Sequence, residues 1–297
     1  MLQAQRIQDE QREAEQLQIA LAAAENDPNL RVYRTDAILN AERSFQSALR
    51  YAYRATRVYE YYTSQSYDGQ ERLFEARMVT GGDLSLGAYL ADLRETFYEF
   101  EERYRAPALR VERISLRDHI LAIPYQDETG RELKERERIE LMRERLRDPH
   151  LLDANGHLTI PFRTRAEDLS PCTFNHKVQY VELSLIGGPL GDDEADILVW
   201  QEGTGIVETV DEGTAYYRFP PGVSVVNPYF GHNQIFDPAV YRRYELRDRP
   251  FLNTAWSIVL DQRDTLDNQD IDLEKLDDIV LYAYYNDFTD PRSCRRR

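Results

Sequence analysis

The amino-acid sequence predicts an α+β protein: an N-terminal helical bundle or long helical hairpin, followed by an antiparallel β-sandwich-like domain. Residues 2–64 are rich in strong helix formers. From about residue 157, apolar and polar residues alternate with the period of two that strands require, and Gly- and Pro-rich turns separate these segments. The 297 residues suffice for two modest domains, which we place at 1–150 and 151–297.

Three helices are expected at the start of the chain. The first covers residues 2–24 and ends at the breaker 26–29, the second runs from an N-cap at Thr35 or Asp36 to about Ser64, and the third ends at Pro107. The second and third carry apolar residues three and four apart: Ile38, Ala41, Phe45, Ala48, Ala52, Ala55 and Tyr59, then Leu86, Leu90, Leu93, Phe97, Phe100 and Tyr104. The stripe on the second helix needs a partner to cover it.

A charged segment, residues 131–147, is interpreted as a solvated helix held by Glu/Arg pairs, with no chemical role. Six strands follow, at 157–162, 177–186, 196–201, 215–219, 256–260 and 278–285. In the second strand, Gln179, Val181, Leu183 and Leu185 are expected to face the core. The last strand is apolar on both faces from Ile279 to Tyr285, which is typical of the middle of a sheet or of a strand under an interface.

Charge and composition exclude several classes of partner. A net charge of −16 argues against nucleic acid and anionic membrane surfaces, which would repel the chain. The sequence has neither a bilayer-spanning apolar run nor an N-terminal signal-peptide core, so we expect no membrane contact by this segment, and a secreted or exported complex would use a signal that this chain does not encode. The distant Cys172 and Cys294 support neither a disulfide scaffold nor a zinc site.

Enzyme motifs are missing from the sequence. The five histidines have no partner at metal-ligand spacing, and no nucleophile elbow, P-loop or dinucleotide fingerprint occurs. The acidic loops 191–194 and 261–272 suggest calcium, but they lack EF-hand spacing, and solvated acids are the better interpretation. We therefore expect no enzyme, no metal and no cofactor.

Tyrosines gather on the second helix and on the last strand. Aromatic rings with a polar tip suit protein interfaces, although core packing explains them equally well. We expect partner binding by the last strand with its loops and by residues 249–256. The candidate partner-binding residues are Arg249, Phe251, Trp256, Ile279, Leu281, Tyr282, Tyr284 and Tyr285.

Short motifs from Ala41 to the end occur in an order that resembles a known family. They are LRETFYE at 93–99, VERISL at 111–116, GHLTIP at 156–161, HKVQYV at 176–181, GPLGD at 188–192, RPF at 249–251 with WSIVL at 256–260, and LDDIVLYAYY at 276–285. This series resembles the C-terminal region of the A component of Tc insecticidal toxins. The resemblance implies late channel helices and a β-domain that docks a B-component-like subunit, within a pentameric, pore-forming assembly that translocates protein.

Two classes of function are therefore weighed. The first is a non-enzymatic structural and binding module, in which helices form part of a bundle or channel, the β-domain docks a partner subunit, and the chain forms a homo-oligomer. The alternative is a carbohydrate-binding β-sandwich, in which Trp200, Trp256 and surface tyrosines stack on sugar rings. A hydrolase with an acidic pair rests only on the abundance of acidic residues.

Overall fold

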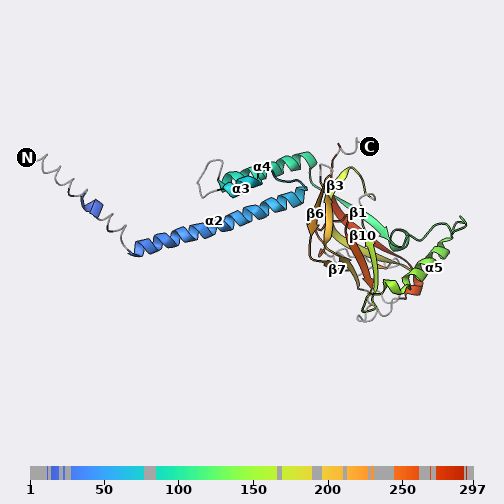
Figure 1. The fold of residues 1–297 in the computed structure, drawn as a ribbon. Coiled ribbons are helices and arrows are strands. Elements are labelled where there is room, and N and C mark those ends of the chain that lie inside the picture. Colours follow the sequence, from blue (N-terminus) through green and yellow to red (C-terminus); the bar gives the residue numbers. More distant parts are fainter. Residues whose placement is uncertain are drawn as a thin grey trace, which may run out of the picture. The chain divides into compact units, whose positions relative to one another are not determined.

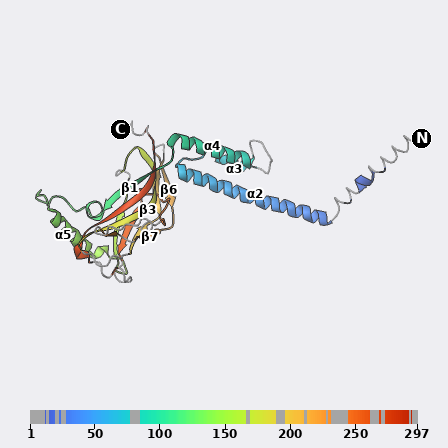
Figure 2. The ribbon, with the colours of Figure 1, turned by 180° about the vertical axis from the view of Figure 1, so that it is seen from behind.

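A computed structural model (Figures 1 and 2) confirms the α+β class, with helices first and antiparallel sheets after them. It describes residues 28–76, 85–165, 169–188, 196–209, 213–226, 229–230, 244–260 and 272–290, together with 12, 15–19, 23, 268 and 292.

The chain divides into two compact units: residues 1–60 with 67–96, and residues 61–66 with 97–297. This division differs from the predicted boundary at residue 150. Strand β1 (Ala108–Ser115) and helix α5 (Glu135–Leu146), both within the predicted helical domain, belong to the second unit. Strand β1 is not evident from the sequence, because its residues, ALRVERIS, mix charged and apolar types without a clean alternation.

The first unit is helical. It contains most of α2 (Pro28–Thr63), α3 (Gln70–Glu75) and the first part of α4 (Leu86–Tyr104). Helix α2 begins at Pro28, before the expected N-cap at Thr35 or Asp36. Proline is tolerated at the first position of a helix, because the N–H that it lacks has no partner within the helix there. The expected helix at 2–24 falls mostly outside the described residues, but the described positions 12, 15–19 and 23 are helical.

The packing of α2 against α4 corrects one expectation. On α4 the buried residues include Tyr89 and Leu93, whereas Leu90, which we placed in the seam, is exposed. Tyr89 takes the place predicted for Leu90 in the contact with α2. Its hydroxyl makes a buried 2.5 Å hydrogen bond with the Thr56 hydroxyl of α2. Tyr89 also makes an edge contact with Tyr67, which in turn contacts Tyr59.

The second unit is a β-sandwich of two four-stranded sheets with one shared hydrophobic core (Figure 1). The first sheet has the order β1–β10–β3–β8 and the second β2–β9–β4–β7, while β5 and β6 form a separate hairpin. All pairs are antiparallel except β3 with β8. The remaining strand bounds are β2 Leu158–Arg163, β3 Thr173–Gly187, β4 Ile197–Gln201, β5 Thr204–Glu208, β6 Thr214–Arg218, β7 Gly222–Val226, β8 Tyr229–Phe230, β9 Ala255–Leu260 and β10 Leu276–Thr289.

The position of β10 confirms that the last strand lies inside a sheet, because β10 pairs with β1 on one side and β3 on the other. The expected faces of β3 are only partly right. Val181, Leu183 and Leu185 are buried in the core, but Val178 takes the place predicted for Gln179. A register shift opposite Tyr284 and Tyr285 leaves Gln179 as the extra residue, which reverses the alternation on its N-terminal side.

Short helical turns complete the second unit: the π-helical η1 (Leu116–Ile120) and the 3-10 turns η2 (Pro149–Leu151) and η5 (Leu273–Lys275). Helix α5 is not the fully solvated helix that we predicted. Its residues Met142 and Leu146 are buried in the sandwich core, and Arg138 is buried beside them. Charged residues so dominate its sequence that this narrow apolar face was overlooked.

Candidate interaction surfaces

Five of the eight predicted partner-binding residues lie in the sandwich core: Phe251, Trp256, Ile279, Leu281 and Tyr285. The Phe251 ring stacks on Tyr285 with centroids 4.8 Å apart, and Trp256 stacks on Phe162. Four of these side chains lie on the core-facing sides of β10 and β9, and Phe251, which precedes β9, packs among them. They stabilise the sandwich, and each exposes no more than 4% of its surface in this conformation.

Tyr282 and Tyr284 are half-buried on the opposite face of β10. Tyr284 stacks on Tyr180 of β3 with ring centroids 4.3 Å apart, and Tyr180 makes an edge contact with the exposed Tyr244. The three rings form an aromatic row across the outer face of this sheet. The row contains Tyr284, one of the tyrosines predicted on the last strand, and it reaches solvent at Tyr244. Two tyrosines of the second helix are exposed as well: Tyr51 and Tyr53.

Arg249, the eighth predicted residue, joins two turns. Its guanidinium donates to Gln201 Oε1 at 3.2 Å and to the Pro220 carbonyl at 2.8 Å, and it lies over the Phe219 ring. Burial lowers the pKa of this half-buried group. The geometry therefore fixes Arg249 in place and gives it a structural role in the sandwich.

The C-terminal end of α2 is held by strand β3, an arrangement that the sequence analysis did not find. Lys177 Nζ donates to the Tyr61 carbonyl and lies 3.9 Å from the Tyr61 ring centroid, while Asn175 Nδ2 donates to the Tyr62 carbonyl. Both carbonyls belong to the last helical turn, whose C=O groups lack partners within the helix. Burial lowers the pKa of Lys177 to about 7. No local sequence signal marks a cap that comes from a strand more than 100 residues away.

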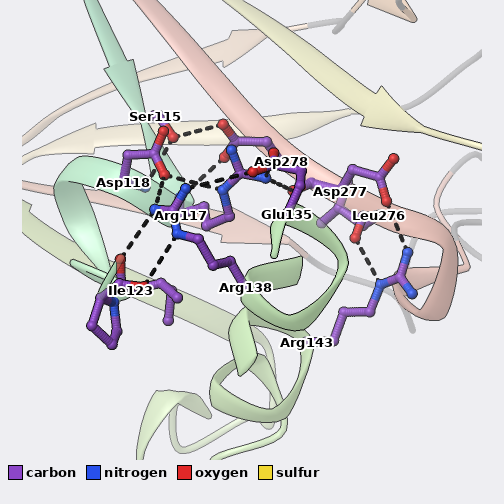
Figure 3. A network of polar contacts seen from close by, with 11 residues as sticks. Ser115, Arg117, Asp118, Ile123, Glu135, Arg138, Arg143, Leu276, Asp277 and Asp278 are labelled. Atoms are coloured by element: carbon purple, nitrogen blue, oxygen red, sulfur yellow. Dashed lines mark hydrogen bonds and ion pairs between the residues drawn. The ribbon is translucent and has the colours of Figure 1, made fainter. Parts of the chain in front are cut away.

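A buried polar network fixes η1 and α5 against the start of β10 (Figure 3). Asp278 accepts from Ser115 Oγ at 2.6 Å and from the Arg117 amide at 3.0 Å. Arg138 donates to Asp118 at 2.7 Å and to the Ile123 carbonyl at 3.1 Å. These arginines hold the pKa of Asp118 below its usual value against the opposing effect of burial. The bonding groups face one another, and of the residues named here only Asp118 also borders the cleft beside β1, so we assign the network a structural role.

A cleft of about 1060 Å³ lies beside β1, where the sandwich is open. Its apolar wall includes Ile114, Phe162, Leu169 and Trp256. Charged residues of both signs also line it, with Glu112, Arg113, Asp118, Arg163, Arg165 and Glu202 among them. The mixed charge favours no particular small ligand.

The N-terminal part of α2 presents an uncovered apolar surface. Every residue from 32 to 44 is exposed, including Val32, Tyr33, Ile38 and Leu39. Farther along the same predicted stripe, Ala52 and Tyr59 are buried within the first unit. One continuous stripe is thus covered at one end and open at the other.

Cys172 is disulfide-bonded, which corrects our expectation of no disulfide. The chain's other cysteine, Cys294, lies outside the described residues. The sequence spacing gave no hint because a disulfide depends on proximity in the fold. In the described part of the chain, no group of three His, Cys, Asp or Glu side chains is placed to hold a metal ion, and no helix combines the length and apolarity needed to cross a bilayer.

Comparisons with known proteins add a structural likeness. No protein-family model matches the chain, and no curated protein matches it. A cryo-EM structure of TcaA-TcaB from Yersinia pseudotuberculosis is similar over 94% of this chain, with a TM-score of 0.47 and 13% identity. The similar region is 15% of the length of that Yersinia chain.

Proposed function

We propose that this chain is a non-enzymatic structural and binding module of an exported, Tc-toxin-like assembly. In this proposal α2 and α4 join a helical bundle or channel wall with copies of the same chain, and the β-sandwich docks a B-component-like protein subunit. The order of motifs quoted above motivates the family, and a pentamer is the oligomer that this resemblance implies. Pore formation and protein translocation would be properties of the whole assembly.

The observation that carries the proposal is the uncovered apolar stripe on α2. An isolated helix is marginal in water, and most helices in proteins are stabilised by packing of their apolar face. The apolar side chains among residues 32–44, such as Val32 and Ile38, are exposed, although Ile38 continues the line of Ala52 and Tyr59. A second helix that lies along this stripe would supply the missing contacts.

The test is the mass of the purified chain by light scattering at several concentrations, compared between two variants. Ile38 is 57% exposed on the stripe, and Leu39 is 43% exposed on a different side of the helix. We expect Ile38→Glu to weaken self-association at least tenfold and Leu39→Glu to leave it nearly unchanged. A monomeric parent chain, or equal effects of the two variants, would contradict helix association through this stripe.

The docking part needs a separate measurement. Binding of a candidate B-component-like subunit to the immobilised chain should fall when Tyr244→Ala or Tyr284→Ala removes part of the outer aromatic row. Tyr216→Ala, which changes an exposed tyrosine on the separate hairpin, is the control. If all three variants bind the subunit equally, the aromatic row is not the docking surface.

The carbohydrate-binding alternative loses one of its two tryptophans. Trp256 is buried in the core and its indole N–H donates to Thr164 Oγ1 at 3.3 Å, so it cannot stack on a sugar. Trp200 remains 38% exposed. A glycan array would still test this alternative, and binding abolished by Trp200→Ala would restore it.

A further inference from the structure

Strand β1 is an edge strand with an open side. It pairs with β10 through eight residues in continuous register, and no described strand lies on its other side. Such an edge presents a row of backbone N–H and C=O groups that another strand can use. At the same end of the sandwich, edge strand β2 contains Pro161, a residue that natural edges use to block pairing, whereas β1 contains no proline.

Hydrogen bonds identify which β1 residues face outward. The Ser115 amide donates to His119 Nδ1 at 2.8 Å, so its N–H points away from β10. Val178 bonds to Asp248 and Arg249 instead of β10, which leaves the opposite Tyr285 to bond with Arg110 on β1. Backbone direction alternates along a strand. Both observations place the outward N–H and C=O groups on the odd-numbered residues.

The usable edge is short and symmetric. At its C-terminal end the Ser115 N–H is already bound by His119, and at its N-terminal end Pro107 has no N–H. Leu109, Val111 and Arg113 remain, with Val111 at the centre. The side chains of Leu109 and Val111 are 56% and 51% exposed.

We propose that β1 pairs with β1 of a second copy of this chain, antiparallel and centred on Val111, to join two four-stranded sheets into one eight-stranded sheet. In this register Val111 lies opposite Val111 of the other copy, and Leu109 lies opposite Arg113. On the face of the sheet that is turned toward the core, Arg110 of each copy lies opposite Glu112 of the other, which makes two such pairs. Opposite charges directly across a strand pair stabilise it.

Other symmetric registers are less favourable. A pair centred on Arg113 would place two arginines face to face and would need the Ser115 edge that His119 occupies. A pair centred on Leu109 would overlap only briefly before Pro107. Arg110 already donates to Asp287 at 2.5 Å, but a guanidinium has five N–H donors and can bind a second carboxylate. The cleft beside Glu112 and Ile114 leaves room for the inner side chains of the other copy.

Cysteine cross-linking tests the register directly. In the proposed pair, the two copies of residue 111 are about 5.5 Å apart between Cα atoms, within disulfide range. The two copies of residue 109 are about 14 Å apart, beyond that range. Under mild oxidation, we expect Val111→Cys to give at least ten times more covalent dimer on a non-reducing gel than Leu109→Cys, an equally exposed control on the same face.

Both cysteine variants should be made in the Ile38→Glu background, so that association through α2 does not contribute to the dimer. A failure of the β1 pairing can then be told apart from a failure of the α2 association. In the same background, Val111→Pro should convert a dimer to a monomer in light scattering, because it removes an outward N–H without touching the bonds to β10. Val111→Thr keeps that N–H and should remain dimeric, and circular dichroism should show that both variants are folded. Equal cross-linking of the two cysteine variants would overturn the proposal. So would an Ile38→Glu variant, with Val111 intact, that is monomeric at every concentration.

Discussion

Strand β10 and the N-terminal part of α2 are both apolar segments that we expected to need a partner, but within the described chain only β10 has one. The two neighbours of β10 come from its own chain, with β1 and β3 along its edges and the second sheet over its inner face. The apolar side chains among residues 32–44 of α2 are exposed in the described chain. Apolar character therefore shows that a surface must be buried, but not which molecule buries it.

The largest expected difference between the two segments is in stability. Phe251→Ala removes a ring that stacks on Tyr285 of β10 in the core, and should lower the free energy of unfolding of the second unit by about 3–5 kcal/mol. Chemical denaturation followed by far-UV circular dichroism would measure it. A loss below 1 kcal/mol would mean that the core around β10 is looser than described.

The disulfide is the next largest contribution on the β10 side. Its member Cys172 precedes β3, and the Cys172 carbonyl accepts from the Asp290 amide just beyond β10. We expect Cys172→Ser to destabilise the chain by about 2–4 kcal/mol, measured by denaturation without reductant. Reduction of the parent chain should cause a similar loss, and its insensitivity to reductant would count against the bond.

Acid should weaken the same region through His176, which is buried between Thr173 and Tyr285. Burial lowers the pKa of this imidazole from 6.5 to about 4. Between these pH values the unfolded chain binds the proton and the folded chain does not, so stability falls as pH drops from 6.5 to 4, by about 3 kcal/mol. His176→Gln should show a shallower pH dependence in urea titrations, and parallel curves for the two proteins would refute this assignment.

Within the helical unit, the covered half of α2 should be moderately sensitive to change. Thr56→Val removes the buried hydrogen bond to Tyr89 and should cost about 1–2 kcal/mol in thermal unfolding. Thr96→Val is the matched control, because the Thr96 hydroxyl bonds only to a carbonyl of its own helix. Equal effects would show that the bond between α2 and α4 contributes little.

The open half of α2 should be the least sensitive position. Ile38→Ala at low concentration should change the free energy of unfolding by no more than about 0.5 kcal/mol, because the side chain is exposed. At high concentration the same change should lower stability if self-association covers Ile38. A concentration-independent result would remove the distinction between the two halves of the helix.

These contrasts show what the sequence could predict. The class, the second and third helices and the long strands followed from periodicity, because a buried face imposes its spacing on the chain. The apolar nature of β10 correctly indicated its place inside a sheet. Strand β1 and the buried face of α5 were missed because charged residues conceal them, and the bulge at Gln179 was missed because it depends on the neighbouring strand.

The candidate site was harder to predict than the fold. Five of the eight residues proposed for partner binding are core residues, since the features that favour an interface also favour a core. The Lys177 and Asn175 contacts to α2, the outward row of β1 and the disulfide join residues that are far apart in sequence. A single sequence carries no local pattern that predicts such pairs.

The cap on α2 also has a consequence for biosynthesis. The carbonyls of Tyr61 and Tyr62 receive their donors from residues that lie 116 and 113 positions later in the chain, respectively. While the ribosome is still making the segment before β3, the last turn of α2 has water as its only partner and should fray. Completion of this helix end is therefore a late event that waits for the sandwich, so ribosome-bound chains stopped before residue 175 should carry a shorter α2 than the finished protein.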